Sequence, residues 1–294
     1  MNIEERVPLT RYTTLGTGGP ARWFARPQTV GELEEALAFA EDEGVSATVV
    51  GLGSNLLAAD EGVDRLVLKL GGDLASVEVA GDRVTAGGGA TNAVVLHRAR
   101  DAALGDFEFA CAIPGTTGGG VWMNAGAYGG DFAHVLERAL VVAASGSDWL
   151  TPDALGLTYR HSGLHDGQVV AQVELRLTPR PVAEIRTTIA QLQSQRKAAQ
   201  PTNKRTFGSV FENPEHELTA GRMLEACGLK GHRVGGAQIS PMHANFIENA
   251  GGARSADAVA LMTEARRRAF AQFGVELRHE VRFLGLPELP VVTT

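Results

Sequence analysis

The sequence has 294 residues, 44% of them hydrophobic and 21% charged, so it is long enough for two or three hydrophobic cores. Its formal net charge of −7 argues against a general nucleic-acid binder, which is usually basic. The start contains no apolar stretch of signal-peptide length, no apolar run approaches the roughly 20 residues that span a bilayer, and two cysteines cannot build a disulfide scaffold or a four-thiolate metal site. The simplest interpretation is a protein of the reducing cytoplasm without membrane insertion.

The first 180 residues are predicted to be rich in strands. Thr29 and Glu32 fit a capping box that starts a helix over 29–43. Residues 77–86 alternate around a Gly-Asp turn, which is typical of a hairpin, and a helix follows the glycines at 87–89. Further strands are expected at 46–51, 65–70, 107–113, 139–150 and 168–179.

The remainder of the chain is predicted to be richer in helices. They are expected at 182–200, where Pro201 stops the helix, at 219–229 and at 256–274, and a last alternating strand is expected at 275–285. No repeat of 20 to 50 residues is present. The element order predicts an α+β protein rather than a doubly wound sheet.

Three glycine-rich stretches suggest a phosphate-binding site, namely GLGSNLL (51–57), GGGATN (87–92) and IPGTTGGGVWMNAGAYG (113–129). Strand-end loops of this composition can aim successive backbone N–H groups at a pyrophosphate. Tight turns alone would explain any one of them. GTGGPA (16–21) matches a dinucleotide fingerprint only by spacing, because Pro20 interrupts it, and no Gly-Lys-Ser/Thr supports a P-loop.

Eight segments, in order along nearly the whole chain, resemble the UDP-N-acetylenolpyruvoylglucosamine reductase family, also called UDP-N-acetylmuramate dehydrogenase. Besides 51–57 and 113–129, they are TTLGTGGPA (13–21), YRHS (159–162), GSVFENP (208–214), AGRMLEACGLKG (220–231), ISPMHANFIENAG (239–251) and LRHEVRFLG (277–285). The resemblance implies an α+β protein with the vanillyl-alcohol-oxidase/PCMH-type FAD-binding fold.

The same resemblance implies three domains. Residues 1–72 would form the first FAD-binding subdomain, joined by a C-terminal strand within 275–294. Residues 73–181 would form the second FAD-binding subdomain, and residues 182–274 a substrate-binding α+β domain that closes over a nucleotide sugar.

The family binds FAD non-covalently and uses NADPH as reductant, so the resemblance implies both for this chain. The expected FAD contacts lie in two stretches: Gly51, Gly53, Ser54, Asn55 and Leu56 in the first, and Ile113, Pro114, Gly115, Thr116, Gly118, Gly119, Asn124, Ala125, Gly126, Ala127 and Tyr128 in the second. The glycines at 115–120 would let the backbone approach the pyrophosphate.

The implied reaction reduces an enolpyruvyl ether, which requires a cation at the substrate carboxylate and a proton donor at the neighbouring carbon. Ser209 matches the proton-donating serine of the family, and Arg160 and Glu280 match the residues around the carboxylate. From the residues alone, the ordinary interpretations are a turn serine, a surface arginine and a solvated strand face.

On the substrate side, the expected contacts are Tyr159, Lys230 and His243. Only 50 positions separate Tyr159 from Ser209, which is short for members with an extra tyrosine-bearing loop and indicates the shorter, loop-lacking type II. Glu212 stands where many members have lysine. His161 and His165, without further ligands, do not indicate a metal site.

The sequence is compatible with two other functions. One is a different flavin oxidoreductase on the same scaffold, against which the segments of 208–285 argue. The other is a catalytically silent FAD or nucleotide-sugar binding protein, against which the presence of Arg160, Ser209 and Glu280 argues. The sequence does not determine the oligomeric state and is compatible with a monomer.

Overall fold

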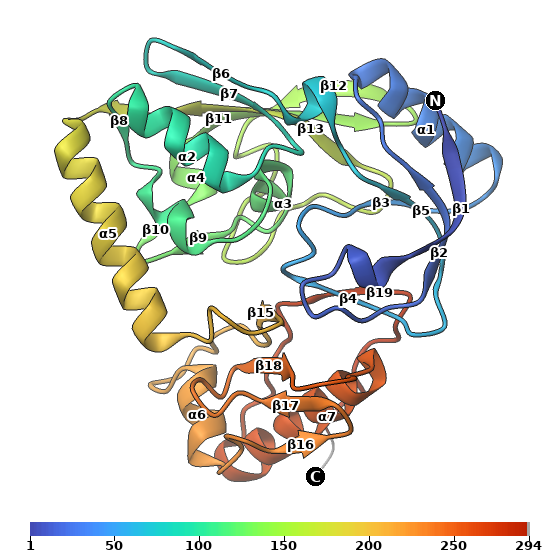
Figure 1. Cartoon of the computed structure of the whole chain (residues 1–294), viewed down its shortest axis with the longest axis vertical. Coiled ribbons are helices and arrows are strands. Elements are labelled where there is room, and N and C mark those ends of the chain that lie inside the picture. Colours follow the sequence, from blue (N-terminus) through green and yellow to red (C-terminus); the bar gives the residue numbers. More distant parts are fainter. Residues whose placement is uncertain (293–294) are drawn as a thin grey trace. The chain divides into compact units, whose positions relative to one another are not determined.

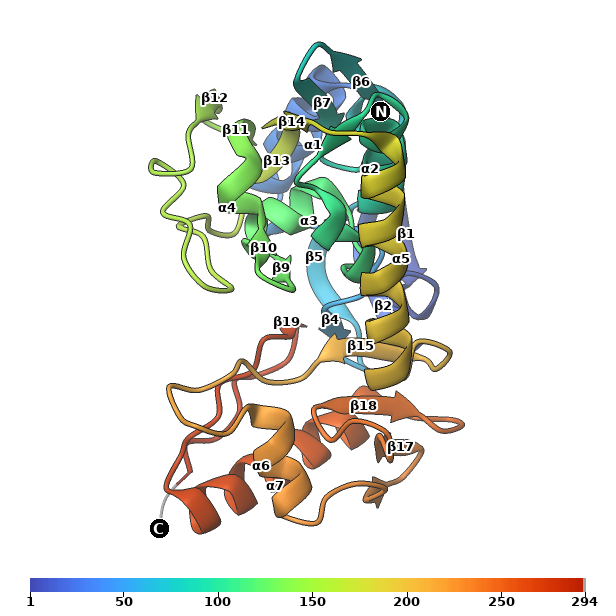
Figure 2. The same cartoon turned by 90° about the vertical axis from the view of Figure 1, so that its left-hand side faces the viewer.

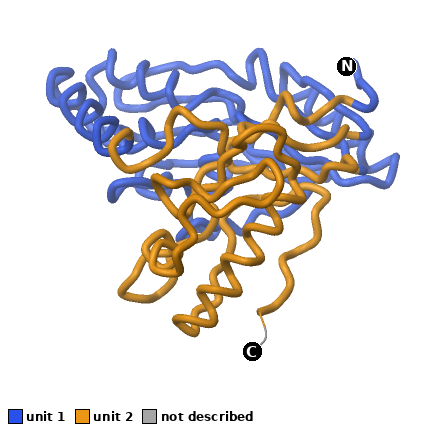
Figure 3. Tube along the Cα trace, turned by 60° about the horizontal axis from the view of Figure 1, so that its bottom comes forward, with its two compact units in different colours: residues 1–6, 22–52, 64–196 blue, residues 7–21, 53–63, 197–294 orange. Residues whose placement is uncertain are grey.

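The computed structural model describes residues 1–292, which divide into two compact units (Figure 3). Unit 1 contains Met1–Arg6, Arg22–Leu52 and Asp64–Arg196. Unit 2 contains Val7–Ala21, Gly53–Val63 and the chain from Lys197 onward. Each unit therefore combines segments that are far apart in the sequence.

Unit 1 begins with a four-stranded sheet in the order β1-β2-β5-β3 and one helix, α1 (Figure 1). The strands are β1 (Ile3–Pro8), β2 (Pro20–Ala25), β3 (Ala47–Val49) and β5 (Val63–Leu68), and the helix is α1 (Val30–Asp42). The predicted N-cap is confirmed, because Thr29 Oγ1 accepts a hydrogen bond from the N–H of Glu32 at 3.2 Å. The Glu32 carboxylate accepts from the N–H of Gln28 instead of Thr29, so only half of the capping box forms.

The second sheet of unit 1 is antiparallel, with the order β12-β11-β13-β7-β6. Its strands are β6 (Val77–Ala80), β7 (Arg83–Gly87), β11 (Leu136–Ala143), β12 (Gly146–Leu150) and β13 (Val169–Arg176). The hairpin predicted around Gly81 and Asp82 is confirmed. The helices α2 (Asn92–Asp101) and α3 (Thr117–Trp122) contribute to the same buried core as this sheet.

Short elements complete unit 1. They are the 3-10 helices η2 (Gly72–Ala75) and η3 (Glu108–Ala112), helix α4 (Phe132–Val135), and the strand pairs β8 (Leu104–Gly105) with β14 (Thr178–Pro179) and β9 (Gly126–Ala127) with β10 (Gly130–Asp131). Figures 1 and 2 both show the β9–β10 hairpin beside α3, where the N–H of Ala125 donates to the carbonyl of Gly120. The long helix α5 (Val182–Ala199) ends before Pro201, as predicted.

Unit 2 is built around two helices and a four-stranded sheet in the order β15-β18-β17-β16. The elements are η1 (Leu9–Arg11), β4 (Leu56–Ala58), β15 (Thr206–Ser209), α6 (Ala220–Ala226), β16 (Arg233–Val234), β17 (Ala237–Ile239), β18 (Phe246–Asn249), α7 (Ser255–Phe273) and β19 (Arg282–Leu284). β19 pairs in parallel with β4. The core includes Leu15 and Leu57, which brings two early segments of the chain into this unit.

Two predicted strands are wrong in whole or in part. Within residues 107–113, Glu108–Ala112 forms the helix η3 and no strand is present. Phe107 and Phe109 pack into one aromatic cluster, with ring centroids 5.3 Å apart. Within 275–285, only Arg282–Leu284 is a strand. In both cases packing into a core overrides the local alternation of the sequence.

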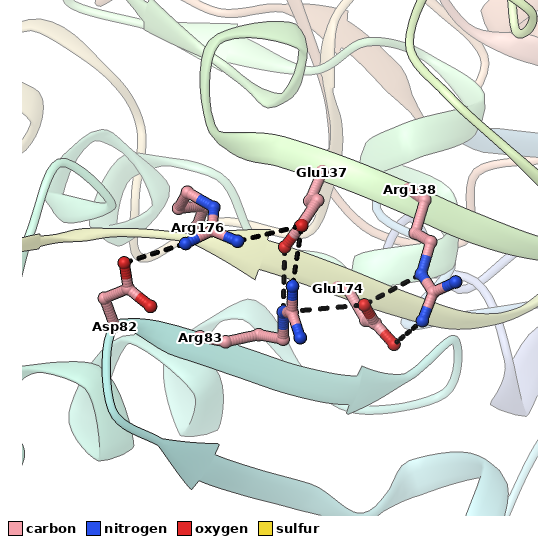
Figure 4. A network of polar contacts seen from close by, with 6 residues as sticks. All are labelled: Asp82, Arg83, Glu137, Arg138, Glu174 and Arg176. Atoms are coloured by element: carbon pink, nitrogen blue, oxygen red, sulfur yellow. Dashed lines mark hydrogen bonds and ion pairs between the residues drawn. The ribbon is translucent and has the colours of Figure 1, made fainter.

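A network of six charged side chains connects β7, β11 and β13, namely Asp82, Arg83, Glu137, Arg138, Glu174 and Arg176 (Figure 4). Arg83 and Arg176 lie directly opposite each other in the sheet, which is unfavourable for like charges. A β-bulge leaves Glu137 without an opposite residue, because Leu136 pairs with Leu175 and Arg138 with Glu174.

Glu137, the extra residue of the bulge, offsets the repulsion between Arg83 and Arg176. The Glu137 carboxylate accepts hydrogen bonds from Arg83 at 2.7 and 2.8 Å and from Arg176 at 2.9 Å. These hydrogen bonds lower the pKa of Glu137 to about 2. The bulge therefore places a carboxylate between two guanidinium groups that would otherwise repel each other.

We expect Glu137→Gln to lower the free energy of unfolding of unit 1 by about 1 kcal/mol at neutral pH. The folded pKa of about 2 lies below that of an unfolded glutamate, about 4.3. The contribution is therefore complete above about pH 4.3 and disappears as the pH falls through 2. Urea unfolding at several pH values measures this, with the exposed Glu78→Gln as control; an equal loss in both variants would contradict the prediction.

Candidate functional site

The three glycine-rich stretches meet within unit 1. The N–H of Gly118 donates to the carbonyl of Gly88 at 2.9 Å, and the N–H of Asn92 donates to the carbonyl of Gly115 at 3.0 Å. The first stretch joins them at Gly51, where an added Cβ would lie 2.7 Å from Thr116 Oγ1. Segments that are far apart in the sequence therefore form one backbone surface.

The glycines of α3 divide into two kinds. A Cβ on Gly118 would lie 2.8 Å from the Gly88 carbonyl oxygen, and one on Gly120 would lie 2.3 Å from the Phe132 ring, so both are required by packing within the protein. Gly119 is exposed, and the nearest atom to its Cβ position is Thr116 Oγ1 at 3.5 Å. Of these three α3 glycines, Gly119 alone leaves bare backbone available to a ligand.

Backbone donors are available on this surface. Within residues 1–292, no hydrogen-bond acceptor is found for the N–H groups of Gly51, Leu52, Gly115 and Thr116. Such N–H groups, together with the Thr116 hydroxyl, suit a ligand with several anionic oxygens. The residues present therefore fit a pyrophosphate-bearing cofactor.

The second half of the first stretch belongs to unit 2. Gly53 has φ +67°, and an added Cβ would lie 1.9 Å from the Tyr12 carbonyl oxygen, so this glycine is required by the fold itself. Asn55 donates from Nδ2 to the carbonyl of Glu280 at 3.1 Å. Leu56 begins β4, and Ser54 lies with its carbonyl oxygen 3.2 Å from the Cβ position of Gly208.

Asn124 follows α3 and holds two other segments of unit 1. Its Nδ2 donates to the carbonyl of Thr158 at 2.9 Å, and its Oδ1 accepts from the N–H of Ala133 at 2.9 Å. The residue is buried and adopts a left-handed backbone with φ 37°. Asn124 therefore acts in the protein as a clamp for the turn that carries Arg160.

Arg160 lies at the tip of that turn. The backbones of Thr158 and His161 bond to each other at 3.0 and 3.2 Å, and Arg160 between them has φ 56°. Its Nη2 donates to the carbonyl of Gly126 at 2.7 Å, and its guanidinium lies 4.8 Å from the ring centroid of Tyr159. The turn is also tied to α3, because Ser162 Oγ donates to the Trp122 carbonyl at 2.6 Å.

The other residues of the second predicted stretch lie next to this turn. Ala125 precedes the β9–β10 hairpin, Gly126 and Ala127 form β9, and Tyr128 and Gly129 form the hairpin tip, both with positive φ. Positive φ at both positions is typical of a two-residue type I′ hairpin. Tyr128 is 46% exposed, and Ile113 and Pro114 precede the α3 glycines.

Ser209 and Glu280 are brought together within unit 2. Ser209 ends β15, after Gly208 with φ +83°. The N–H of Glu280 donates at 2.8 Å to the carbonyl of Val210, the residue after Ser209. Arg160 belongs to unit 1.

Lys230 belongs to a charged group at the end of α6, and His243 packs against the same helix at Gly221. Lys230 donates to the Glu225 carboxylate at 2.7 Å, and Arg222 reaches the same carboxylate at 3.3 Å. Burial, and to a smaller degree the charge of Lys230, lower the pKa of His243. His243 is therefore neutral near pH 7 and can donate or accept a hydrogen bond.

Two cations of unit 1 were missed by the sequence interpretation. Lys69 follows β5, and its Nζ donates to the Gly51 carbonyl. Arg196 continues the inward-facing stripe of Ile185 and Leu192 on α5, and burial lowers its pKa. The helical spacing of Arg196 from Ile185 and Leu192 could have indicated from the sequence that Arg196 lies on the inward face of α5. No sequence pattern indicates the position of the Lys69 side chain.

In the described part of the chain, no helix is long and apolar enough to cross a membrane. The same residues contain no cluster of three or more histidine, cysteine, aspartate or glutamate side chains that could hold a metal ion.

Comparisons with known proteins agree on one family. Residues 200–284 match the family description "UDP-N-acetylenolpyruvoylglucosamine reductase, C-terminal domain", and residues 21–148 match "FAD binding domain". UDP-N-acetylenolpyruvoylglucosamine reductase 2 of Symbiobacterium thermophilum is 42% identical over 285 residues, covering 96% of this chain and 92% of that protein. The Limosilactobacillus reuteri reductase is 38% identical, covering 97% of this chain and 96% of that protein.

A solved structure agrees with the sequence relatives. The crystal structure of UDP-N-acetylenolpyruvylglucosamine reductase from Thermus caldophilus matches with a TM-score of 0.85 at 37% identity, and covers 97% of this chain and 99% of that one. The fold and the glycine surface thus define a protein of the FAD-binding α+β class. Within that class, the chain belongs to the UDP-N-acetylenolpyruvoylglucosamine reductase family. The predicted family and fold class are confirmed.

We expect Asn124→Gly to loosen the turn that carries Arg160 without straining the backbone, because glycine adopts positive φ freely. The variant loses both side-chain hydrogen bonds, so amide hydrogen exchange in 158–163 should accelerate by about tenfold. Hydrogen exchange followed by mass spectrometry measures this, with Asn203→Gly as the exposed control. Unchanged protection in 158–163 would show that Asn124 is not the clamp.

Proposed function

We propose that this chain is an NADPH-dependent oxidoreductase that binds FAD non-covalently and reduces UDP-N-acetylglucosamine enolpyruvate to UDP-N-acetylmuramate. The observation that carries the proposal is the similarity along 96% or more of the chain to the reductases of that name. The product is a peptidoglycan precursor, so we place the reaction in cell-wall synthesis in the cytoplasm, with a small nucleotide sugar as partner and neither nucleic acid nor membrane involved.

The chemistry divides between the cofactor and the protein. When bound, FAD supplies hydride transfer from NADPH to the double bond of the substrate. Addition of hydride to the terminal vinyl carbon leaves negative charge on the neighbouring carbon, delocalised into the carboxylate. The protein must therefore stabilise that charge and deliver one proton.

Arg160, Glu280 and Ser209 are proposed for these tasks. The permanently charged, forked guanidinium of Arg160 suits a carboxylate, and its hydrogen bond to Gly126 and its contact with Tyr159 fix its direction. Ser209 would donate the proton to the carbon next to the carboxylate. Glu280 would act beside it, since its backbone is bonded to the residue after Ser209.

The cofactor contacts are proposed from the glycine surface. Gly51, Gly115 and Thr116 would hold the FAD pyrophosphate through backbone N–H groups, and Gly119 would offer bare backbone beside them. The remaining predicted residues of both stretches would line the rest of the cofactor. Gly53, Gly118 and Asn124 would contact FAD only through their backbone atoms. Other parts of the protein lie where a Cβ of Gly53 or Gly118 would be, and the Asn124 side chain is hydrogen-bonded within the protein.

For the substrate, we propose contacts from Tyr159, Lys230 and His243. Tyr159 is 55% exposed, Lys230 belongs to the charged group at the end of α6, and His243 packs against the same helix. The chain is proposed to be of the short, loop-lacking type, with Glu212 in place of the lysine common in the family. The domain limits of 72, 181 and 274 remain part of this proposal.

The reaction is tested by anaerobic absorbance spectroscopy with Ser209→Ala. In the wild type, NADPH should bleach the flavin spectrum, and the enolpyruvyl sugar should restore it. In Ser209→Ala, bleaching should stay within about twofold of the wild-type rate, because it does not involve the proton donor. Product formation should fall by about a hundredfold or more.

Ser194→Ala, which changes an exposed serine on α5, is the matched control and should behave as the wild type. A variant with both half-reactions unaltered would exclude Ser209 as the acid. Flavin that recovers only with oxygen or another acceptor would point to a different oxidoreductase. A protein that takes up no FAD would exclude the proposed function altogether.

Gly119→Ala tests whether the cofactor lies against bare backbone. The Cβ meets nothing closer than 3.5 Å, and the position is helical, so the apoprotein should gain about 0.5–1 kcal/mol of stability. FAD should bind about tenfold more weakly, because the methyl group enters the ligand's space. Fluorescence titration of FAD measures this.

Gly31→Ala in α1 is the control, since its Cβ position is equally open. It should stabilise the apoprotein and leave FAD affinity unchanged. An FAD affinity of Gly119→Ala equal to that of the wild type would show that Gly119 of α3 does not contact the cofactor.

A further inference from the structure

Lys69 is a half-buried cation at the glycine surface of unit 1. It directly follows β5, its N–H donates to the Ala25 carbonyl at 2.9 Å, and its Nζ donates to the Gly51 carbonyl. Gly51 in turn adjoins Thr116. The ammonium thus lies at the Gly51 carbonyl, next to the N–H groups of Gly51 and Leu52, which have no acceptor within the described residues.

The surroundings of Lys69 differ from those of most cations in this unit. Carboxylate partners are found for Arg22, Arg26, Arg65, Arg83, Arg100, Arg138, Arg176 and Arg180. Among residues 1–292, no carboxylate pairs with Lys69, and its only hydrogen-bond acceptor is the Gly51 carbonyl. Burial without a counter-charge lowers the pKa of Lys69.

A half-buried ammonium without an anion is unfavourable, and it has three N–H donors of which one is used. An anion bound at this surface would supply the missing charge. The neighbouring backbone N–H groups suit phosphate oxygens, whereas a single carboxylate would leave several of them unused.

We propose that Lys69 is an FAD-binding residue whose ammonium holds the pyrophosphate against the Gly51 and Thr116 loops. This inference rests on the proposed function, because it needs FAD as the ligand. Lys69 then has two roles in one position: it pins the Gly51 carbonyl in the apoprotein and neutralises phosphate charge in the complex.

Two variants separate these roles. Lys69→Met removes both the charge and the hydrogen bond, whereas Lys69→Gln removes the charge and keeps an N–H donor for the Gly51 carbonyl. Both should weaken FAD binding by about tenfold, and the dependence of FAD affinity on ionic strength should become shallower. Lys204→Met, which removes an exposed charge, should change the affinity less than about twofold.

The melting temperature of the apoprotein gives a readout independent of activity. Removal of an uncompensated half-buried charge should leave the melting temperature of Lys69→Gln unchanged or raised, while the FAD complex of the same variant melts lower than the wild-type complex. An apoprotein melting temperature that is unchanged or raised, together with a lower melting temperature of the FAD complex, supports the proposal.

Three results would overturn it. Wild-type FAD affinity in Lys69→Gln would show that the charge does not contribute. Equal destabilisation of apoprotein and complex in both variants would show that Lys69 only supports the loop. Failure of the wild type itself to bind FAD would overturn the proposed function and this inference together. The wild-type titration therefore separates that outcome from the two results that overturn only the role of Lys69.

Discussion

The contact of α3 with the backbone of neighbouring strands is the constraint on which unit 1 depends. An added Cβ on Gly88 would lie 1.9 Å from the Val170 carbonyl oxygen, and one on Gly118 would lie 2.8 Å from the Gly88 carbonyl oxygen. Three layers of backbone therefore pack without side chains between them. This arrangement brings β7, β13 and α3 within hydrogen-bonding distance and creates a surface of peptide groups, which is the kind of surface that recognises phosphate oxygens.

The same helix also positions Arg160, the arginine proposed for the substrate carboxylate. Where α3 ends, the Trp122 carbonyl and the Asn124 side chain hold Ser162 and Thr158, on either side of Arg160. A change in the packing of α3 would therefore move both the backbone donors proposed for the cofactor and the guanidinium proposed for the carboxylate. Hydride transfer is sensitive to small displacements of the reacting groups. Because α3 holds both the backbone donors and Arg160, it keeps their relative positions fixed.

The sequence predicted much of the fold and which segments make up the candidate site, but not the structural role of each residue. Helices with clear caps, such as the one after Thr29, and the hairpin at Gly81 follow from local rules. The structure brings the predicted glycine stretches together at Gly51, Gly88 and Gly115, yet Gly118 and Gly120 serve packing within the protein, which only tertiary contacts reveal. Lys69 could not be recognised, because a lysine that ends an apolar strand looks like an ordinary solvent-facing residue.

Left-handed backbone offers an independent argument for the site. Asn124, Tyr128 and Arg160 all have positive φ, which costs about 1–2 kcal/mol for each residue with a Cβ. Positive φ alone does not mark function, since Ala103 has it beside a short strand. At Asn124 and Arg160, however, the side chain makes hydrogen bonds that glycine could not make. Their strain is tolerated because the side chains fix a turn whose charged tip the proposed chemistry requires.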